Sequence, residues 1–218
     1  VLGKDKFVLD RSEAYIGVLI DDLVTEGTKE PYRMLSSRAE YRLILRQDNA
    51  DLRLTDLGYE LGLVSEKQYE GFKQRRLDLE NEIARIEAVR VTPSEKVNKF
   101  LEEKGTSALN TGASLADLLR RPQIKYLDLA EIDPDINTED QVLIDSVENA
   151  IKYAGYIEIE QRRIDKFKKR EQKVLPDDID YKSITGLRNE AKEKLDKMRP
   201  ESIGQASRIS GVSPADIG

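Results

Sequence analysis

Arginine side chains are concentrated between residues 33 and 53, and their spacing suits contact with phosphate groups. The five are Arg33, Arg38, Arg42, Arg46 and Arg53. The middle three are four residues apart, so on one helix they would form a stripe with about 5–6 Å between neighbours. Each guanidinium can donate two parallel hydrogen bonds to a phosphate. The alternative is a solvated face of ion pairs with three nearby acids, Glu40, Asp48 and Asp51.

A second group of basic side chains lies near residue 166. Its members are Arg162, Arg163, Lys166, Lys168, Lys169, Arg170 and Lys173, and Asp165 and Glu171 offset them. Such a run at a helix end suits phosphate binding or the helix dipole, and the alternative is a solvated helix end. Base stacking would need aromatic side chains nearby. Phe167, Tyr153 and Tyr156 are candidates, although aromatic side chains at helical spacing also fit a core.

Composition excludes several kinds of chemistry within these 218 residues. Cysteine and histidine are absent, which removes disulfides, thiol nucleophiles, the usual zinc sites and every histidine-dependent triad. The net charge is −6, so phosphate contact has to come from local basic patches. No glycine-rich dinucleotide loop and no apolar stretch of membrane-spanning length is present.

Two long helices are expected to organise the chain. Ser65 begins one that extends over 66–90, with Phe72, Leu79 and Ile86 repeating every seven residues. Thr138 is expected to cap the other, roughly 139–172, whose first half presents an apolar stripe around Val147. Matching stripes predict that the two helices pair antiparallel.

Shorter elements are expected between and before these helices. A helix capped by Ser12 and extending to about Val24 has apolar positions at Ile16, Leu19, Ile20 and Leu23. Ser36 and Ser37 are expected to cap a helix that continues through Arg46, and Thr55 to cap a short helix closed by Gly62. Further helices are expected at 94–105 and 115–121, followed by an irregular connector over 123–137.

The last forty residues predict a small helical subdomain. A linker at 176–180 precedes a helix at 188–198, and a short helix closed by Gly211 leads to another capped by Ser213, with Pro214 and Asp216 completing the cap. Arg208 is the one basic residue of this hairpin, which favours packing or partner contact over nucleic-acid reading. The expected partner-binding residues are Ile203, Arg208, Ile209, Val212 and Ile217. The fold class is therefore mainly α, with two long paired helices and a small C-terminal helical bundle or hairpin.

Four stretches carry a resemblance to a known family. Residues 12–26, 30–56, 152–158 and 199–217 resemble the MnmG (GidA) family closely and in order, and 66–145 resemble it more weakly. The resemblance implies that 1–26 is the tail of an FAD-binding domain, that 27–176 is the helical domain, and that 177–218 is a small C-terminal subdomain.

The family installs aminomethyl or carboxymethylaminomethyl groups on the wobble uridine of tRNA, together with the GTPase MnmE. The resemblance implies a cytoplasmic, homodimeric parent that uses FAD, NADH and a folate. The flavin part and its cysteines lie outside this chain, which is expected to bind no cofactor and to catalyse nothing alone. The expected tRNA-binding residues are Arg33, Arg38, Arg42, Arg46, Arg53, Arg162, Arg163, Lys166, Lys169 and Arg170. Glu158 and Glu160 stand where relatives often have a basic residue. The alternative is a helical interaction scaffold with no nucleic-acid role.

Overall fold

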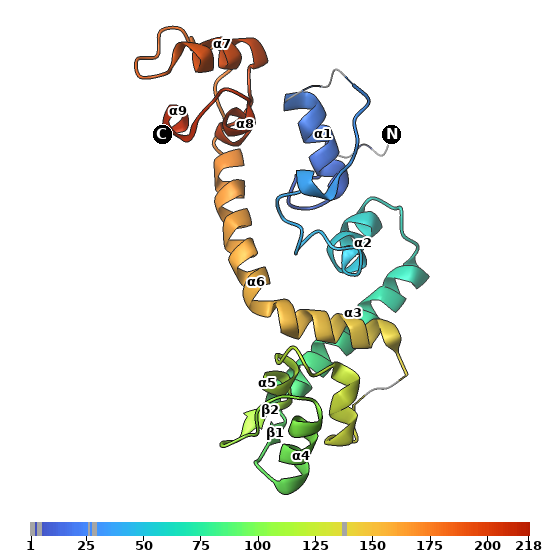
Figure 1. Ribbon diagram of the computed structural model, residues 1–218. Coiled ribbons are helices and arrows are strands. Elements are labelled where there is room, and N and C mark those ends of the chain that lie inside the picture. The colour runs from blue at the N-terminus through green and yellow to red at the C-terminus, as the bar shows by residue number, and fades with distance from the viewer. Residues whose placement is uncertain (1–2, 4–5, 26, 28–29, 137–138) are drawn as a thin grey trace. The chain divides into compact units, whose positions relative to one another are not determined.

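The computed structural model is mainly helical and describes residues 3, 6–25, 27, 30–136 and 139–218 (Figure 1). Its helices are α1 (Tyr15–Thr25), η1 (Ser36–Arg38), α2 (Ala50–Glu60), α3 (Glu66–Ala88), α4 (Glu95–Glu103), α5 (Leu115–Leu119), η2 (Tyr126–Glu131), α6 (Gln141–Glu171), α7 (Asn189–Met198), α8 (Ile203–Arg208) and α9 (Pro214–Ile217). Strands β1 (Arg90–Val91) and β2 (Ala113–Ser114) form an antiparallel pair with Arg90 opposite Ser114. The expected mainly α class is confirmed. In the described part of the chain, no helix is long and apolar enough to cross a membrane.

The chain forms two compact units. One combines residues 1–45 with 158–218 and is called the split unit here, and the other is residues 46–157, the continuous unit. Helix α6 contributes its first part, through residue 157, to the continuous unit and the remainder to the split unit. The expected domain boundaries at 26/27 and 176/177 stay a prediction.

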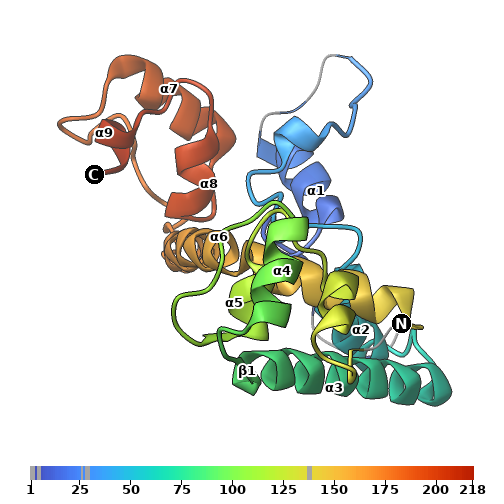
Figure 2. The ribbon, with the colours of Figure 1, turned by 60° about the horizontal axis from the view of Figure 1, so that its bottom comes forward.

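The continuous unit is built around α3. Ser65 caps this helix through a capping box with Gln68, as its sequence predicts. Phe72 and Ile86 are buried and Leu79 is partly buried, which confirms the seven-residue seam. Figure 2 shows α4 and α5 on the same side of α3. Leu79 and Ile86 therefore face a core to which several elements contribute, and Phe72 is buried outside that cluster.

The segment over 123–136 supplies much of that core. It was expected as an irregular connector, but it forms η2, and the side chains of Ile124, Tyr126 and Leu129 are completely buried. The Tyr126 hydroxyl donates to the carboxylate of Glu82 on α3, 2.5 Å away. A short segment rich in acidic residues is thus ordered by three apolar anchors.

The two long helices share this core. Leu79 of α3 and Ile144 and Val147 of α6 belong to the same apolar cluster, to which α5 and η2 also contribute. Thr138, the expected cap of α6, lies outside the described residues. Asp140 accepts hydrogen bonds from the backbone N–H groups of Val142 and Leu143, so a carboxylate caps the first turn.

Two expectations about smaller elements are wrong, and the apolar side chains of α1, which belongs to the split unit, are partly exposed. Helix α1 begins at Tyr15, because the hydroxyl of Ser12 donates to Asp10 and does not cap a helix. Thr55 lies inside α2, which begins five residues earlier at Ala50. The apolar stripe of α1 does not face this unit's own core, since Ile16 and Ile20 are about half exposed and the helix buries Val18.

The C-terminal bundle of α7, α8 and α9 belongs to the split unit. Ser213, Pro214 and Asp216 form the predicted capping box, and Gly211 has a left-handed φ of 98°. Tyr181, Leu195, Ala206 and Ile209 form a small buried cluster, and partly buried side chains surround them: Leu175, Ile179, Leu187, Met198, Val212 and Ile217. The short terminal helices are therefore covered by α7 and the 175–187 segment.

Candidate nucleic-acid interface

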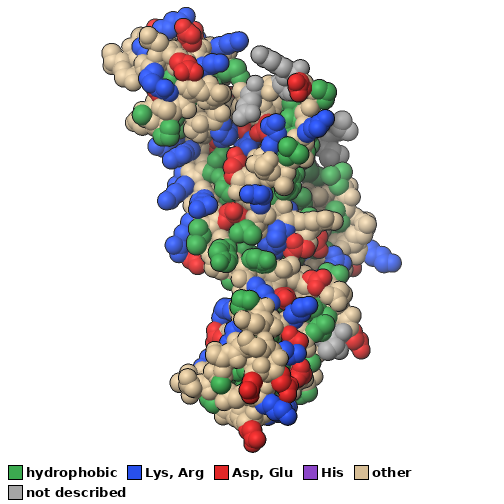
Figure 3. Space-filling view, viewed as in Figure 1, with side chains coloured by type: hydrophobic (Ala, Val, Ile, Leu, Met, Phe, Trp, Pro, Cys, Tyr) green, Lys and Arg blue, Asp and Glu red, His purple; other side chains and the backbone are tan. Residues whose placement is uncertain are grey.

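The part of α6 in the split unit presents a basic face. Arg163, Lys166 and Arg170 are three and four residues apart, so they project from one side of the helix. They line a groove of about 280 Å³ whose other residues are Glu40, Tyr41, Phe167, Gly204, Ser207 and Arg208. Figure 3 shows Lys and Arg side chains gathered along α6. Three cationic side chains of one helix thus line the same groove.

These three cations have no carboxylate partner among the described residues. All three are exposed, as is Lys169 on the neighbouring line of the helix. By contrast, exposed Arg162 donates to Glu158 one turn earlier, at 2.5 Å. Lys168 faces another way and contacts Glu13 at 3.0 Å and Asp10 at 3.6 Å. Unpaired guanidinium and ammonium groups remain available to a phosphate, whereas paired ones would first have to exchange partners.

Buried ion pairs fix the position of Glu40, which lines the groove. Arg11 is 6% exposed, and its guanidinium contacts Asp22 at 2.5 Å, Asp21 at 2.9 Å and Glu40 at 2.8 Å. It also donates to the carbonyl of Arg38. Burial would raise the pKa of Asp22, but hydrogen bonds from Arg11, Tyr32 and Arg38 outweigh it and lower that pKa. Asp22 therefore stays ionised in the folded state.

The aromatic side chains of the groove are held by their neighbours. Phe167 lies 6.0 Å from the ring of Tyr41 in a tilted arrangement, and the guanidinium of Arg208 lies 5.3 Å from the Phe167 ring centre. Burial, followed by the nearby Glu40, raises the pKa of Tyr41. Because Phe167 already has a cation on its face, it supports the groove and is poorly placed to stack on a base.

Helix α8 approaches α6 through a glycine and an arginine. A β-carbon on Gly204 would overlap the carboxylate of Glu171. That carboxylate accepts from the hydroxyl of Ser202 at 2.9 Å and from Arg208 at 2.5 Å. Arg208 also contacts Asp21 of α1 at 2.8 Å. These contacts fix the α8 side of the groove to α6 and α1.

The expected helix over 36–46 is wrong, so the arginine stripe does not exist as a stripe. After the short η1 the chain continues in turns and bends. The backbone of this segment forms long-range hydrogen bonds. The N–H of Ile44 donates to the buried carboxylate of Glu160, and the guanidinium of Arg11 donates to the carbonyl of Arg38. Sequence spacing favours a helix here, but the segment keeps only isolated local hydrogen bonds, such as that from the N–H of Leu45 to the carbonyl of Tyr41 at 2.8 Å, beside these long-range ones.

The predicted arginines of this region have different surroundings. Arg38 contacts Asp22 at 3.4 Å and lies over the ring of Tyr32, whereas Arg33 and Arg42 are exposed. Arg46 and Arg53 belong to the continuous unit. Arg46 contacts Asp48 at 3.0 Å, and Arg53 donates to Asn49 and to a backbone carbonyl. The predicted ion pair of Arg46 with Asp48 is therefore present.

The expected partner-binding residues lie mostly inside their own bundle. Ile209 is buried, and Val212 and Ile217 pack against the same cluster. Arg208 is occupied by its two carboxylates, and Ile203 is half-buried outside the cluster. The helices α8 and α9 are thus already packed against α7 through this cluster, and contact with a partner stays a prediction.

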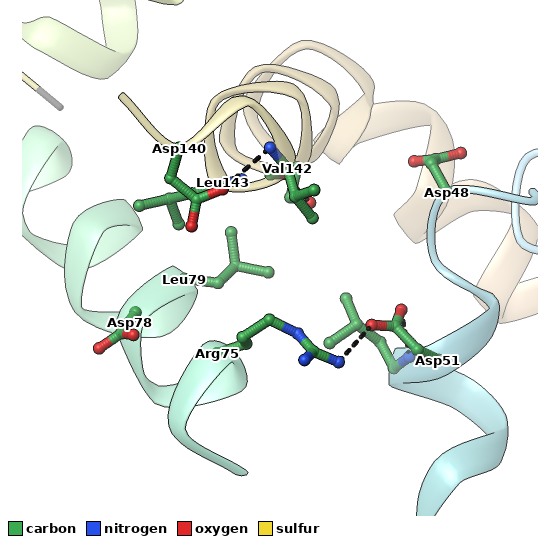
Figure 4. A pocket seen from close by; sticks show the side chains of 10 residues that line it. Asp48, Asp51, Arg75, Asp78, Leu79, Asp140, Val142 and Leu143 are labelled. Carbon is green, nitrogen blue, oxygen red and sulfur yellow. Dashed lines mark hydrogen bonds and ion pairs between the residues drawn. The ribbon is translucent and has the colours of Figure 1, made fainter. Parts of the chain in front are cut away.

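An acidic pocket lies in the continuous unit between α2, α3 and the start of α6 (Figure 4). Asp51 contacts Arg75 at 3.6 Å, Asp48 pairs with Arg46, and Asp140 caps α6. The carboxylates are thus used within the unit. In the described ranges, no group of three or more acidic side chains is arranged to hold a metal ion.

Sequence reasoning missed the residues that complete the groove. Glu40 was considered as a partner of the predicted stripe, and Tyr41 and Ser207 were not considered. Glu160 was noted as an acid in a basic position, and its role is to accept the backbone N–H of Ile44 at 3.0 Å while 8% exposed. The acidic residue at position 160 was the signal available in the sequence. Nothing in the residues around Glu160 indicates that its hydrogen-bond donor, Ile44, is 116 residues away.

Comparisons with known proteins agree with this architecture. Residues 66–161 match the family described as the tRNA modifying enzyme MnmG/GidA C-terminal helical domain, and residues 163–218 match the MnmG/GidA C-terminal helical bundle. The chain is 57% identical over 217 residues to the tRNA uridine 5-carboxymethylaminomethyl modification enzyme MnmG of Caldicellulosiruptor saccharolyticus, which covers 100% of this chain and 35% of that protein. MnmG of Pediococcus pentosaceus is 54% identical, with 99% and 34% covered.

Solved structures lead to the same family. GidA of Aquifex aeolicus in its form II crystal is 42% identical, with a TM-score of 0.79, and the alignment covers 99% of this chain and 33% of that one. The form I crystal gives 41% identity and a TM-score of 0.75. The chain thus spans about a third of the length of these relatives. On this evidence it belongs to the MnmG/GidA family of tRNA-modifying enzymes and corresponds to the family's C-terminal helical region.

Proposed function

We propose that this chain binds the phosphate backbone of tRNA for an enzyme that modifies the wobble uridine. The observation that carries the proposal is the groove face of Arg163, Lys166 and Arg170, three exposed cations without carboxylate partners among the described residues. The relatives are named as enzymes that modify tRNA uridine. An exposed basic face and a tRNA substrate both support binding of the tRNA phosphate backbone.

The other predicted tRNA-binding residues differ in whether they already have partners. Lys169, Arg33 and Arg42 are exposed and form no ion pair with a described residue, so they are available for further phosphate contacts. Arg162, Arg38, Arg46 and Arg53 have partners inside the chain. We expect them to contribute less, because each would have to give up an existing interaction.

Backbone contact gives affinity and orientation but little choice of sequence. The basic face should therefore hold tRNA without selecting an anticodon. Each phosphate contact releases counterions, so affinity should fall with salt by about 0.7–0.9 log units per contact per decade of salt. Selection of the target base is assigned to the remainder of the parent enzyme.

The test is a triple substitution of Arg163, Lys166 and Arg170 to Gln in the full-length protein. We expect an intact fold, weaker binding of an unmodified tRNA transcript, and a salt dependence shallower by about two to three log units per decade of salt. The matched control replaces three lysines of the continuous unit that do not line the groove, Lys96, Lys99 and Lys125, with Gln. Equal losses in the two triple variants would mean that net charge alone matters. Unchanged tRNA affinity in the groove variant would reject the proposal and favour the scaffold alternative.

The chemistry of the parent enzyme is assigned outside this chain. Dinucleotide cofactors bind at the ends of parallel strands, at a glycine-rich turn that leads into a helix. The described residues offer only the two-residue antiparallel pair β1 and β2, which does not fit FAD. We propose that FAD and NADH act in the other part of a cytoplasmic, homodimeric parent.

The C-terminal bundle is proposed to contact the GTPase MnmE. Its apolar residues Ile209, Val212 and Ile217 are needed for its own packing, so a partner would use other side chains, such as Ile203, which is half-buried and lies outside that cluster. Ile203→Asp in the full-length protein should weaken MnmE association and leave tRNA affinity unchanged. Leu127→Asp, at a side chain 41% exposed in the continuous unit, is the matched control. Equal MnmE affinity in both variants and the wild type would contradict this assignment.

A further inference from the structure

The basic groove of the split unit contains one carboxylate that phosphate binding does not explain. Glu40 lines the groove together with Arg163, Lys166 and Arg170. Its side chain is 48% exposed, and it is held from behind by the buried guanidinium of Arg11. A carboxylate beside a bound phosphate repels it, so this position weakens the grip on any polyanion unless the ligand also offers a hydrogen-bond donor.

Glu40 differs in chemistry from the other polar groups of the groove. An ionised carboxylate only accepts hydrogen bonds. The neighbouring hydroxyl of Ser207 is occupied, since it donates to the carbonyl of Gly204 at 2.7 Å. Arg11 contacts Oε1 of Glu40 through two nitrogens and Oε2 through one longer bond of 3.3 Å, so Oε2 is the less engaged oxygen. The groove thus presents cations for phosphates and one fixed carboxylate beside them.

We propose that Glu40 makes the groove selective for RNA over DNA by accepting a hydrogen bond from a ribose 2′-hydroxyl. The proposal rests on the tRNA-binding role proposed above. The 2′-hydroxyl is the donor that distinguishes an RNA backbone from a DNA backbone. An RNA strand held by the three cations offsets the repulsion with this bond, whereas a DNA strand meets the repulsion alone.

The experiment compares two ligands of one sequence on the full-length protein. One ligand is an unmodified tRNA transcript, and the other is the DNA oligonucleotide with the same sequence. Binding of each is measured at one salt concentration for the wild type and for Glu40→Gln. The amide oxygen of Gln can still accept from Arg11, so the wall of the groove should be retained. Glu158→Gln is the matched control, because it removes the same charge from the same unit at a carboxylate that does not line the groove.

The expected result is a change in the ratio of the two affinities. Glu40→Gln should bind the DNA ligand more tightly and the tRNA no more tightly, so that the preference for RNA falls by about tenfold. Glu158→Gln should keep the wild-type ratio. A role of Glu40 in folding alone would change both affinities by the same factor, and that result would overturn the proposal. So would a wild-type protein that binds both ligands equally.

A second measurement covers a Glu40→Gln variant that folds poorly. The wild type is titrated with tRNA transcripts that carry blocks of 2′-deoxynucleotides, and at least one block should reduce affinity by about tenfold. No effect of any block would reject the role of Glu40. Failure of the tRNA-binding proposal is recognised separately, because the Arg163, Lys166 and Arg170 triple variant would then bind tRNA as tightly as the wild type.

Discussion

The two compact units are stabilised in different ways. The continuous unit has one apolar cluster in which Leu101, Leu115 and Leu118 are completely buried. The split unit has small apolar clusters and a network of buried charges around Arg11 and Asp22. Its segments are far apart in the chain, and ion pairs such as Arg208 with Asp21 join them.

This difference matches what the two units have to do. A buried charge is costly in an apolar core, so the charged side chains of the continuous unit lie around that core, and several form ion pairs, such as Arg85 with Asp133 at 2.7 Å. Ion pairs are directional, and they fix side chains such as Glu40 at the edge of a groove while leaving them accessible. The split unit can therefore present free cations beside a fixed carboxylate, and we expect its stability to depend on charge.

The largest expected effect is a charge placed in the continuous core. Ile86→Asp should cost several kcal/mol, because the Ile86 side chain is completely buried among apolar neighbours. Leu77→Asp, on the same helix at a side chain 49% exposed, should be tolerated. Hydrogen exchange of the full-length protein, followed in peptides from 95–130, reports the difference. Equal protection in the two variants would mean that α3 does not face a closed core.

The next effect separates buried from exposed ion pairs in the split unit. Arg11→Met leaves the buried carboxylate of Asp22 without its main partner, and breaking such a pair costs about 3–5 kcal/mol. Arg162→Met removes an exposed pair with Glu158 and should cost no more than about 1 kcal/mol. Urea melts of the full-length protein measure both. Similar small losses would show that charge does not hold this unit together.

The smallest effects come from two helical glycines, one in each unit. In α1, a β-carbon on Gly17 would overlap the backbone carbonyls of Leu9 and Asp10, so Gly17→Ala should cost about 1–3 kcal/mol. In α3, Gly71 has no atom within 4 Å of that position, and Gly71→Ala should stabilise by about 0.5–1 kcal/mol. Thermal melts should shift in opposite directions. A stabilising Gly17→Ala would show that the 9–10 backbone does not pack against α1.

Much of the fold was predictable where local chemistry sets it. Ser65, Ser94 and Ser213 cap helices at the predicted places, and Gly62 and Gly105 end helices in left-handed conformations. The positions of these elements follow from side chains within three or four residues of the backbone groups that they satisfy.

The candidate site was only partly predictable for the same reason. The basic run of α6 was evident from the sequence, as was its helical spacing. The expected helix over 36–46, and with it the arginine stripe, is absent. Glu160 accepts from the N–H of Ile44 and Arg11 donates to the carbonyl of Arg38, and both backbone groups would have been bonded within a helix. Contacts over such distances leave no local pattern.

The sequence by itself determined the mainly α class, the caps of α3, α4 and α9, and the presence of a basic face on α6. These depend on periodicity and short-range hydrogen bonds. Only the tertiary structure decided which cations stay unpaired, which carboxylate stands beside them, and that α7 covers the terminal helices. Those outcomes depend on buried ion pairs and apolar contacts between segments up to 187 residues apart, whose energies are set by burial and geometry.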